Sequence, residues 1–349
     1  MIRYLVSISF PSFYPIEFFF GFLQSNHQVL TFPKMLHYHG EWGQPSSTRL
    51  MDQEEHPLPE RIDAVWISIL EKKFYSIESE LPVNKLKQLF TLKDAFSDES
   101  IYEYIIVGIA PYGGVALWSY GFKKSSLVIW MYGETTQVRM KDFLPLNPTV
   151  TLGDYCKLFL DNDPVVKQNL ETNGLPPRDL FDNYMKQFTY RYLPLFEHWN
   201  EDEEKWLKYT EEEQETKPVL DYIEEALYDG THDKLHDGGL MQYHEAGKPK
   251  KLAIKWHIKK SEYTAYFWFE DEAIRTAFDK FYGFHTDTKT DFIIRIDPEK
   301  KKYQLALYRY GLQEPKIIPE DAYQLIVFKN KFEHYRSENY DQPCGAWIW

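Results

Sequence analysis

Two histidines, His37 and His39, are the first residues whose types and spacing could do chemistry. At i and i+2 they would lie on one face of a strand, within reach of one metal ion. Zinc sites normally take three or four His, Cys or carboxylate ligands, and Glu41 and His56 follow at no recognised spacing. We therefore expect ordinary polar strand or loop histidines here, and a metal-dependent hydrolase remains an alternative.

A second group of imidazoles and carboxylates lies between His232 and Gly239. We expect this segment to be a loop that leads into a strand. The alternative is that its side chains bind a metal ion or act as a general base. The glycine-rich segment 110–115 lacks the phosphate-binding patterns and their strand-to-helix context, so it predicts a hairpin turn. Because no GxSxG, HExxH or Cys–His signature occurs, we expect no catalytic residue, no bound metal and no cofactor.

The charge balance limits the partners that the chain could bind. It carries 53 acidic and 40 basic residues, a formal net charge of −13. A phosphate backbone would repel such a chain, so direct nucleic-acid binding is disfavoured. A basic protein would be attracted to it, although negative charge also serves simply to keep a protein in solution.

The cysteines and the apolar segments predict a cytoplasmic location. Cys156 and Cys344 are the two cysteines and form no CxxC, which suits a reducing compartment. Pro11, Pro15 and Glu17 interrupt the apolar beginning of the chain, unlike a secretory signal. Because no run approaches the ~18–20 apolar residues that span a bilayer, we expect no membrane contact.

The chain repeats one pattern at a spacing of about 190 residues. Residues 59–69 and 249–258 both place apolar residues at every second position, with Trp66 and Trp256 on the same face. Such alternation predicts half-buried strands. The pattern continues through a second strand, a helix and two further strands, at 73–77, 82–90, 104–111 and 116–121, and at 263–269, 270–281, 291–298 and 306–311.

The order β-β-α-β-β predicts antiparallel sheets with a helix on one face, and therefore an α+β fold. We expect two related units, 1–145 and 231–349, the second an internal duplication of the first. The segment between them, 146–230, is expected to be a helical linker.

Three helices are expected in this linker. Thr151 and Asp154 resemble a capping pair, and Asn173-Gly174 is a stop signal. A second helix is expected from Asp179 toward Trp199, disturbed at Pro194. A third would begin near Pro218 and end before Gly230.

An acidic stretch, EDEEKWLKYTEEEQE at 201–215, contains aromatic residues among its carboxylates. It is either a solvated helix face or a docking surface for a basic protein. Loops with exposed aromatic side chains elsewhere would equally serve a small-ligand or glycan-binding module, which is a further alternative. The candidate partner-binding residues are Glu201, Asp202, Glu203, Glu204, Trp206, Tyr209, Glu211 and Glu212, together with Trp42 and Tyr112 in other loops.

Several short motifs resemble one family. They are Tyr14-Pro15-Ile16-Glu17, His39-Gly40-Glu41-Trp42-Gly43, Leu58-Pro59, Glu71-Lys72-Lys73-Phe74-Tyr75, Leu81-Pro82 and the segment from Val107 to Trp118. Together they resemble the bacterial domain-of-unknown-function family 2931 over roughly residues 4–140. Its members are often described as lipoproteins, but we expect no signal peptide or lipidated cysteine here.

The resemblance implies a function without catalytic residues. Some proteins of this family are encoded beside antibacterial toxins of type VI secretion. The resemblance therefore implies an immunity protein that binds a cognate toxin in the cytoplasm and occludes its active site. A basic toxin domain would suit the acidic balance of this chain.

Overall fold

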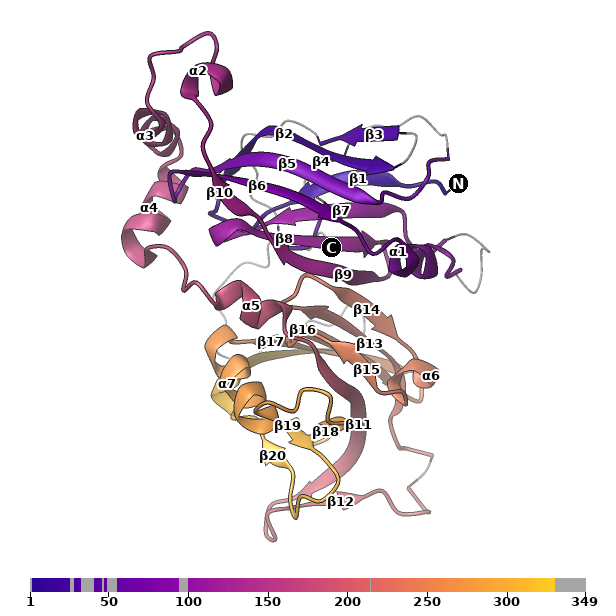
Figure 1. The fold of residues 1–349 in the computed structure, drawn as a ribbon. Helices are drawn as coiled ribbons and strands as arrows, with labels where there is room; N and C mark the ends of the chain where they lie inside the picture. Colours follow the sequence, from indigo (N-terminus) through magenta and orange to yellow (C-terminus); the bar gives the residue numbers. More distant parts are fainter. Residues whose placement is uncertain are drawn as a thin grey trace. The chain divides into compact units, whose positions relative to one another are not determined.

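The computed structural model describes residues 2–25, 28–32, 41–45, 47–48, 55–93, 100–213 and 215–329. The chain divides into two compact units (Figure 1). Unit 1 comprises Met1–Lys186 with Tyr228–His232, and unit 2 comprises Gln187–Leu227 with Asp233–Trp349. The described residues form mostly β-sheet with a few helices, so the predicted α+β class is confirmed.

Unit 1 contains two five-stranded sheets, in the orders β4-β1-β7-β8-β9 and β10-β6-β5-β2-β3. Strands β1 and β7 run parallel, and all the other neighbours run antiparallel. The strands are β1 (Leu5–Ser9), β2 (Ile16–Ser25), β3 (Gln28–Thr31), β4 (Ser47–Thr48), β5 (Arg61–Ser68), β6 (Lys73–Glu80), β7 (Tyr104–Ile109), β8 (Gly114–Tyr120), β9 (Ser125–Tyr132) and β10 (Glu134–Thr136).

The main core of unit 1 lies between these sheets. Val6 and Val107 of the first sheet pack in one cluster with Trp66 of the second, and Leu86 and Phe90 of α1 join them. A smaller cluster includes Ile67 on the other face of the second sheet and Phe159 of α3. The helices are α1 (Val83–Phe90), η1 (Pro111–Gly113), α2 (Met140–Phe143), α3 (Leu152–Asn162), α4 (Pro164–Asn173) and α5 (Leu180–Met185).

Unit 2 also has two sheets, β12-β11-β18-β19-β20, with β15 paired to β11, and β14-β13-β16-β17-β21. The first residue of β14, His232, is assigned to unit 1 and the rest of that strand to unit 2. Here β11 and β18 run parallel. The strands are β11 (Phe188–Asn200), β12 (Lys205–Lys208), β13 (Val219–Leu227), β14 (His232–Leu235), β15 (His244–Ala246), β16 (Pro249–Ile258), β17 (Ser261–Phe269), β18 (Thr290–Asp297), β19 (Lys302–Tyr308), β20 (Lys316–Ile317) and β21 (Tyr323–Lys329). The helices are α6 (Asp237–Leu240), α7 (Asp271–Tyr282) and η2 (Glu320–Ala322).

Part of the expected helical linker is wrong. The Thr151 side chain does accept a hydrogen bond from the Asp154 backbone N–H at the start of α3, and α4 does end at Gly174, whose φ is +72°. The helix expected from Asp179 ends at Met185, however, because the aromatic-rich residues that follow form strand β11.

The helix expected from Pro218 is strand β13. The spacing of Leu220, Ile223 and Leu227 suits a helix, but burial in this strand alternates, with Ile223, Glu225 and Leu227 facing inward. As a consequence, residues 187–227 belong to unit 2 rather than to a linker. The loop expected from His232 onward also contains regular structure, namely β14 and the short helix α6.

Candidate protein-binding surface on the acidic hairpin

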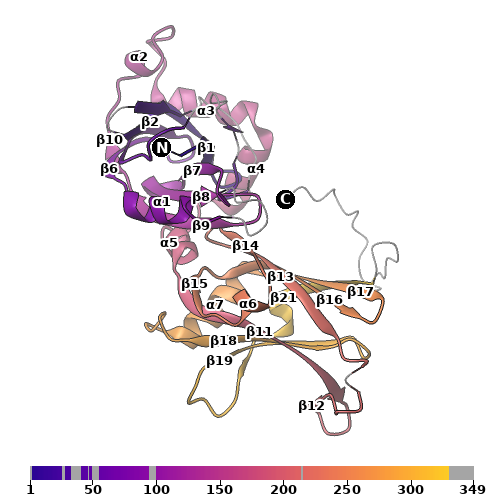
Figure 2. The same cartoon turned by 90° about the vertical axis from the view of Figure 1, so that its right-hand side faces the viewer.

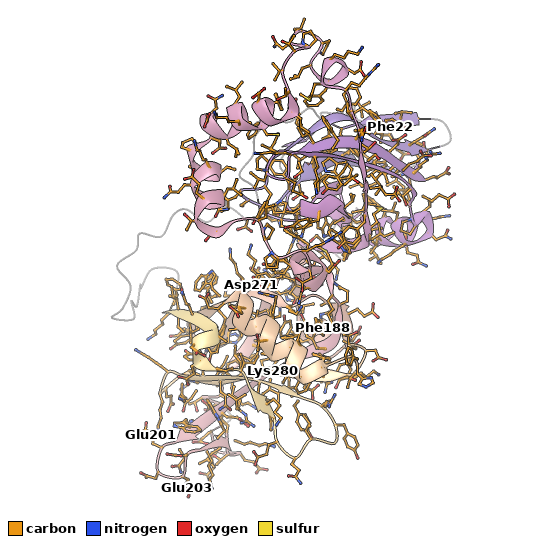
Figure 3. All side chains as sticks on the ribbon, turned by 60° about the vertical axis from the view of Figure 1, so that its left-hand side comes forward. Phe22, Phe188, Glu201, Glu203, Asp271 and Lys280 are labelled. Atoms are coloured by element: carbon orange, nitrogen blue, oxygen red, sulfur yellow. The ribbon has the colours of Figure 1, made fainter. Side chains whose placement is uncertain are left out.

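The acidic stretch lies on a β-hairpin of unit 2, not on a helix face. Residues Glu197–Asn200 of β11 pair antiparallel with Lys205–Lys208 of β12. Figure 2 shows this hairpin extending away from the rest of unit 2. The four acidic residues 201–204 form its turn and are all exposed, and Figure 3 shows Glu201 and Glu203 at this end of the unit.

Hydrogen bonds hold this turn in place. The Asn200 side-chain oxygen accepts from the backbone N–H groups of Asp202 and Glu203, at 3.0 and 3.1 Å. Buried Asp297 accepts from the Trp199 backbone N–H at 2.7 Å. The backbone under the carboxylates is therefore ordered by short polar contacts, which lowers the entropy cost of binding a partner.

Aromatic rings flank the acidic turn. Trp199 and Trp206 are directly paired across the two strands, with ring centroids 5.3 Å apart. The next residue of β12, Leu207, is 38% exposed. Tyr209 lies against His198 with centroids 4.0 Å apart. Trp and Tyr are among the residues enriched in protein-binding hot spots.

The electrostatics of Tyr209 follow from its surroundings. Burial raises the pKa of Tyr209 to about 12, and the nearby carboxylates of Glu299, Asp297 and Glu213 add to the shift. Tyr209 is therefore neutral at physiological pH and presents a hydroxyl group rather than a further negative charge.

In the second half of the acidic stretch, one carboxylate is hydrogen-bonded within the protein and others are exposed. Glu213 accepts hydrogen bonds from the Thr210 backbone N–H and hydroxyl, both at 2.8 Å, and these bonds lower the pKa of Glu213. Its other oxygen lies 3.5 Å from His198 Nε2. Glu211 and Glu212 instead are exposed. The stretch thus presents two groups of exposed carboxylates, at 201–204 and 211–212.

Trp42 and Tyr112 lie in unit 1, whereas the acidic stretch lies in unit 2. Trp42 is half-buried and meets Trp118 edge to face, with centroids 4.8 Å apart. The Tyr112 hydroxyl donates to the Pro176 carbonyl at 2.8 Å, and its φ of +61° marks a tight turn. Both side chains make contacts within the unit.

Unit 1 also holds a carboxylate network that the sequence did not reveal. Glu71 accepts from the Tyr75 hydroxyl at 2.6 Å, the Ser68 hydroxyl at 2.8 Å and the Tyr112 backbone N–H at 2.9 Å. It thereby ties the turn after β5 to η1. Glu71 and Tyr75 lie in the segment 71–75 and Tyr112 lies in the segment 107–118, both of which resemble the family, but nothing in their spacing predicts that they touch.

The residues considered above as possible metal ligands lie in several parts of the chain. His37 and His39 lie outside the described residues. Glu41 is exposed, and His56 Nδ1 lies 2.8 Å from Gln28 Oε1. Both ring nitrogens of His232 bond to protein atoms, Ser125 Oγ and the Gly121 carbonyl. Among the residues that the structure describes, no three His, Cys, Asp or Glu side chains gather as a metal site.

Comparisons with known proteins identify the family of the chain. No helix in the described ranges is long and apolar enough to cross a membrane. No curated protein matches, and no solved structure matches. A family model, described as protein of unknown function (DUF2931), matches residues 1–187, more than half of the 349 residues. The chain therefore belongs to the DUF2931 family.

Proposed function

We propose that this chain is a non-catalytic immunity protein that binds a cognate type VI secretion toxin in the cytoplasm and covers its active site. The observation that carries the proposal is the extended hairpin, in which exposed carboxylates at 201–204 stand beside Trp199, Trp206 and Leu207. Carboxylates would steer a basic toxin domain into contact, and the aromatic rings would anchor it.

The hairpin is also one place where unit 2 differs from unit 1. In unit 1 the chain passes from β1, which ends at Ser9, to β2, which begins at Ile16. In unit 2 β11 extends to Asn200, and β12 precedes β13, which begins at Val219. Binding residues are often carried on such additions to a rigid scaffold, which supports the hairpin as the toxin-contacting element.

A glycan-binding function is less well supported. It would use exposed aromatic rings around Trp42 and Tyr112. These side chains instead contact Trp118 and the Pro176 carbonyl within unit 1. A hydrolase centred on His37 and His39 would depend on residues outside those that the structure describes.

We further propose that unit 2 is an internal duplication of unit 1, as the sequence predicted. Support comes from sheet order, because β4-β1-β7-β8-β9 corresponds to β15-β11-β18-β19-β20, with one parallel pair at the same place in each. Likewise β3-β2-β5-β6-β10 corresponds to β14-β13-β16-β17-β21. In sequence, α1 lies between β6 and β7, and α7 lies between the corresponding strands β17 and β18.

Equivalent side chains make equivalent contacts in the two units. The Tyr4 hydroxyl donates to the Pro57 carbonyl, and the Tyr190 hydroxyl donates to the Gly247 carbonyl, each at 2.8 Å. Pro57 lies two residues before Pro59, which precedes β5, and Gly247 lies two residues before Pro249, which is the first residue of β16. A shared hydrogen bond at the same place in the topology supports common descent over chance alternation.

Both tyrosines also contact the helix of their own unit. Tyr4 lies beside Phe90 at the end of α1, with centroids 5.8 Å apart. Tyr190 lies beside Phe278 of α7, at 5.9 Å. A tyrosine at or just before the first strand of each unit thus contacts the helix of that unit.

A growth assay tests the proposed function. The secreted toxin encoded beside this chain would be expressed in a bacterial host, alone or together with the chain. Wild-type chain should restore growth, whereas reversal of the four turn carboxylates to lysine should abolish the rescue. A matched control reverses four exposed carboxylates elsewhere, Glu60, Glu103, Glu134 and Glu171, and should rescue normally. Absence of a neighbouring toxin, or equal rescue by both variants, would contradict the proposal.

A further inference from the structure

A short segment far along the chain completes unit 1. Residues Tyr228–His232 lie outside the range 1–187 that the family model matches, yet they belong to unit 1. They contact the face of the first sheet opposite the main core, where Trp118 packs with Ile106 and Ala116. We call this five-residue segment the strap.

The strap is held by its backbone at two close contacts. The Trp118 indole N–H donates to the Asp229 carbonyl at 3.0 Å, and this bond is buried. Gly230 meets Gly43 backbone to backbone, so that a Cβ added to Gly230 would lie 2.8 Å from Gly43 Cα. Both glycines have positive φ, +85° and +81°. A side chain at position 230 would therefore be strained and would clash.

The strap histidine is recognised through three hydrogen bonds. His232 Nε2 lies 3.1 Å from the Gly121 carbonyl and must donate to it, which leaves Nδ1 to accept from the Ser125 hydroxyl at 3.0 Å. The same hydroxyl oxygen accepts from the His232 backbone N–H at 2.9 Å. The ring also packs against Tyr120, with centroids 5.1 Å apart. This arrangement fits histidine and few other residues.

The remaining strap residues shape it and fix its beginning. Asp229 Oδ1 accepts from the Thr231 backbone N–H at 2.9 Å and from its hydroxyl at 2.6 Å, which closes a local turn. Tyr228 stacks on Tyr184, with centroids 5.2 Å apart and planes 18° from parallel. Each of the five strap residues thus either contacts unit 1 or shapes the turn of the strap, so the contact is sequence-selective.

We propose that this face of unit 1 is a recognition site for a short peptide, and that the strap is its resident ligand in cis. The ligand class is an aromatic residue followed by an Asp-Gly-Thr turn and a histidine. The selectivity for this peptide sequence comes from hydrogen bonds of side chains and from the close contact of Gly230 with Gly43. It does not come from the addition of a strand to a sheet edge. A free peptide of this sequence should then compete with the strap for the site. Because the strap is part of the chain, it acts at an effective concentration on the millimolar scale, which the free peptide has to overcome.

A competition experiment on the full chain tests this site. The probe is the labelled peptide ALYDGTHDK, which copies residues 226–234. The Gly230→Ala chain, whose own strap is weakened, should bind the peptide at least tenfold more tightly than wild type in fluorescence anisotropy. His232→Ala provides a second weakened chain, and Gly153→Ala is a matched control, because a Cβ there meets nothing closer than 3.9 Å.

The specificity control is the same peptide with Gly230 replaced by alanine, which should not bind. Far-ultraviolet circular dichroism establishes which chains are folded. If a folded Gly230→Ala or His232→Ala chain binds no peptide up to about 1 mM, or binds both peptides equally, the face is ordinary packing and the proposal is wrong.

Discussion

The indole of Trp256 stacks on the ring of Tyr263 across the β16–β17 pair, with centroids 5.6 Å apart and planes 7° from parallel. Trp66 and Tyr75 form the same cross-strand stack in unit 1, at 5.8 Å and 23°. Both tryptophans are fully buried, and neither indole N–H has a hydrogen-bond partner among the described residues. The two units therefore share this core contact and also its unpaired donor.

Truncation of either tryptophan should strongly destabilise the chain. Trp256→Ala and Trp66→Ala should each lower the free energy of unfolding by about 3–5 kcal/mol, because each leaves a cavity in a core. Chemical denaturation followed by circular dichroism measures the loss. Tyr310→Ala is the control, since Tyr310 is 100% exposed and should change stability by less than about 0.5 kcal/mol. A loss of that size at Trp66 or Trp256 would contradict the assigned cores.

The paired tyrosine hydroxyls offer a test of the duplication. Tyr4→Phe and Tyr190→Phe each remove a hydrogen bond to a backbone carbonyl, at 2.8 Å in both units, and Tyr190→Phe also removes a side-chain hydrogen bond with Tyr192. Each should cost about 1–3 kcal/mol, because a carbonyl loses its partner inside the protein. Denaturation of both variants compares the losses. A cost at one position and none at the other would argue against equivalent roles.

Tyr209 should titrate unusually high. Ultraviolet difference absorbance of wild type against Tyr209→Phe should show one tyrosine with a pKa of about 12. Since the folded-state pKa is raised above the unfolded value of about 10, the associated stability is fully present below pH 10. It is lost as pH rises from about 10 through 12. Ionisation of Tyr209 near pH 10 would contradict its place beside His198 and the carboxylates.

The thiol of Cys156 should be unreactive in the folded protein. It is fully buried, and burial raises the pKa of Cys156 to about 11. At pH 8 its thiolate fraction falls roughly 100-fold below that of an ordinary cysteine, and alkylation slows by at least that factor. The Cys344→Ser background isolates the signal, and denaturant should restore ordinary reactivity. Rapid alkylation of the folded chain would show that α3, which carries Cys156, does not pack against Ile67 and Phe74 of the second sheet.

The strands and helices of the repeated pattern were predictable because their apolar spacing is unambiguous. Trp66 and Trp256 stand in alternating segments, and both are buried in strands. Ile274 and Phe278 follow helical spacing and face the core from α7. Local pattern and tertiary burial agree at these positions, so the sequence suffices.

The region from Phe188 to Leu227 was mispredicted because local pattern and tertiary pairing disagree there. Pro194 favoured an interrupted helix, yet it lies in β11, paired in parallel with Ile294 of β18. The two paired residues are 100 positions apart in the sequence, so the residues around Pro194 carry no pattern that indicates the pairing. Composition singles out the acidic stretch as a candidate binding surface. Its hairpin, and the contact of Trp206 with Trp199, depend on the strand that local pattern misses.

The most direct test of the proposed function is the affinity of the purified chain for the toxin encoded beside it. Isothermal titration would compare wild type with the chain in which Glu201, Asp202, Glu203 and Glu204 are lysines. We predict at least a tenfold loss of affinity, about 1.4 kcal/mol, with an unchanged melting temperature and a wild-type affinity that weakens with salt. An affinity that stays within about threefold of wild type, under ~1 kcal/mol, would contradict the acidic hairpin as the contact surface.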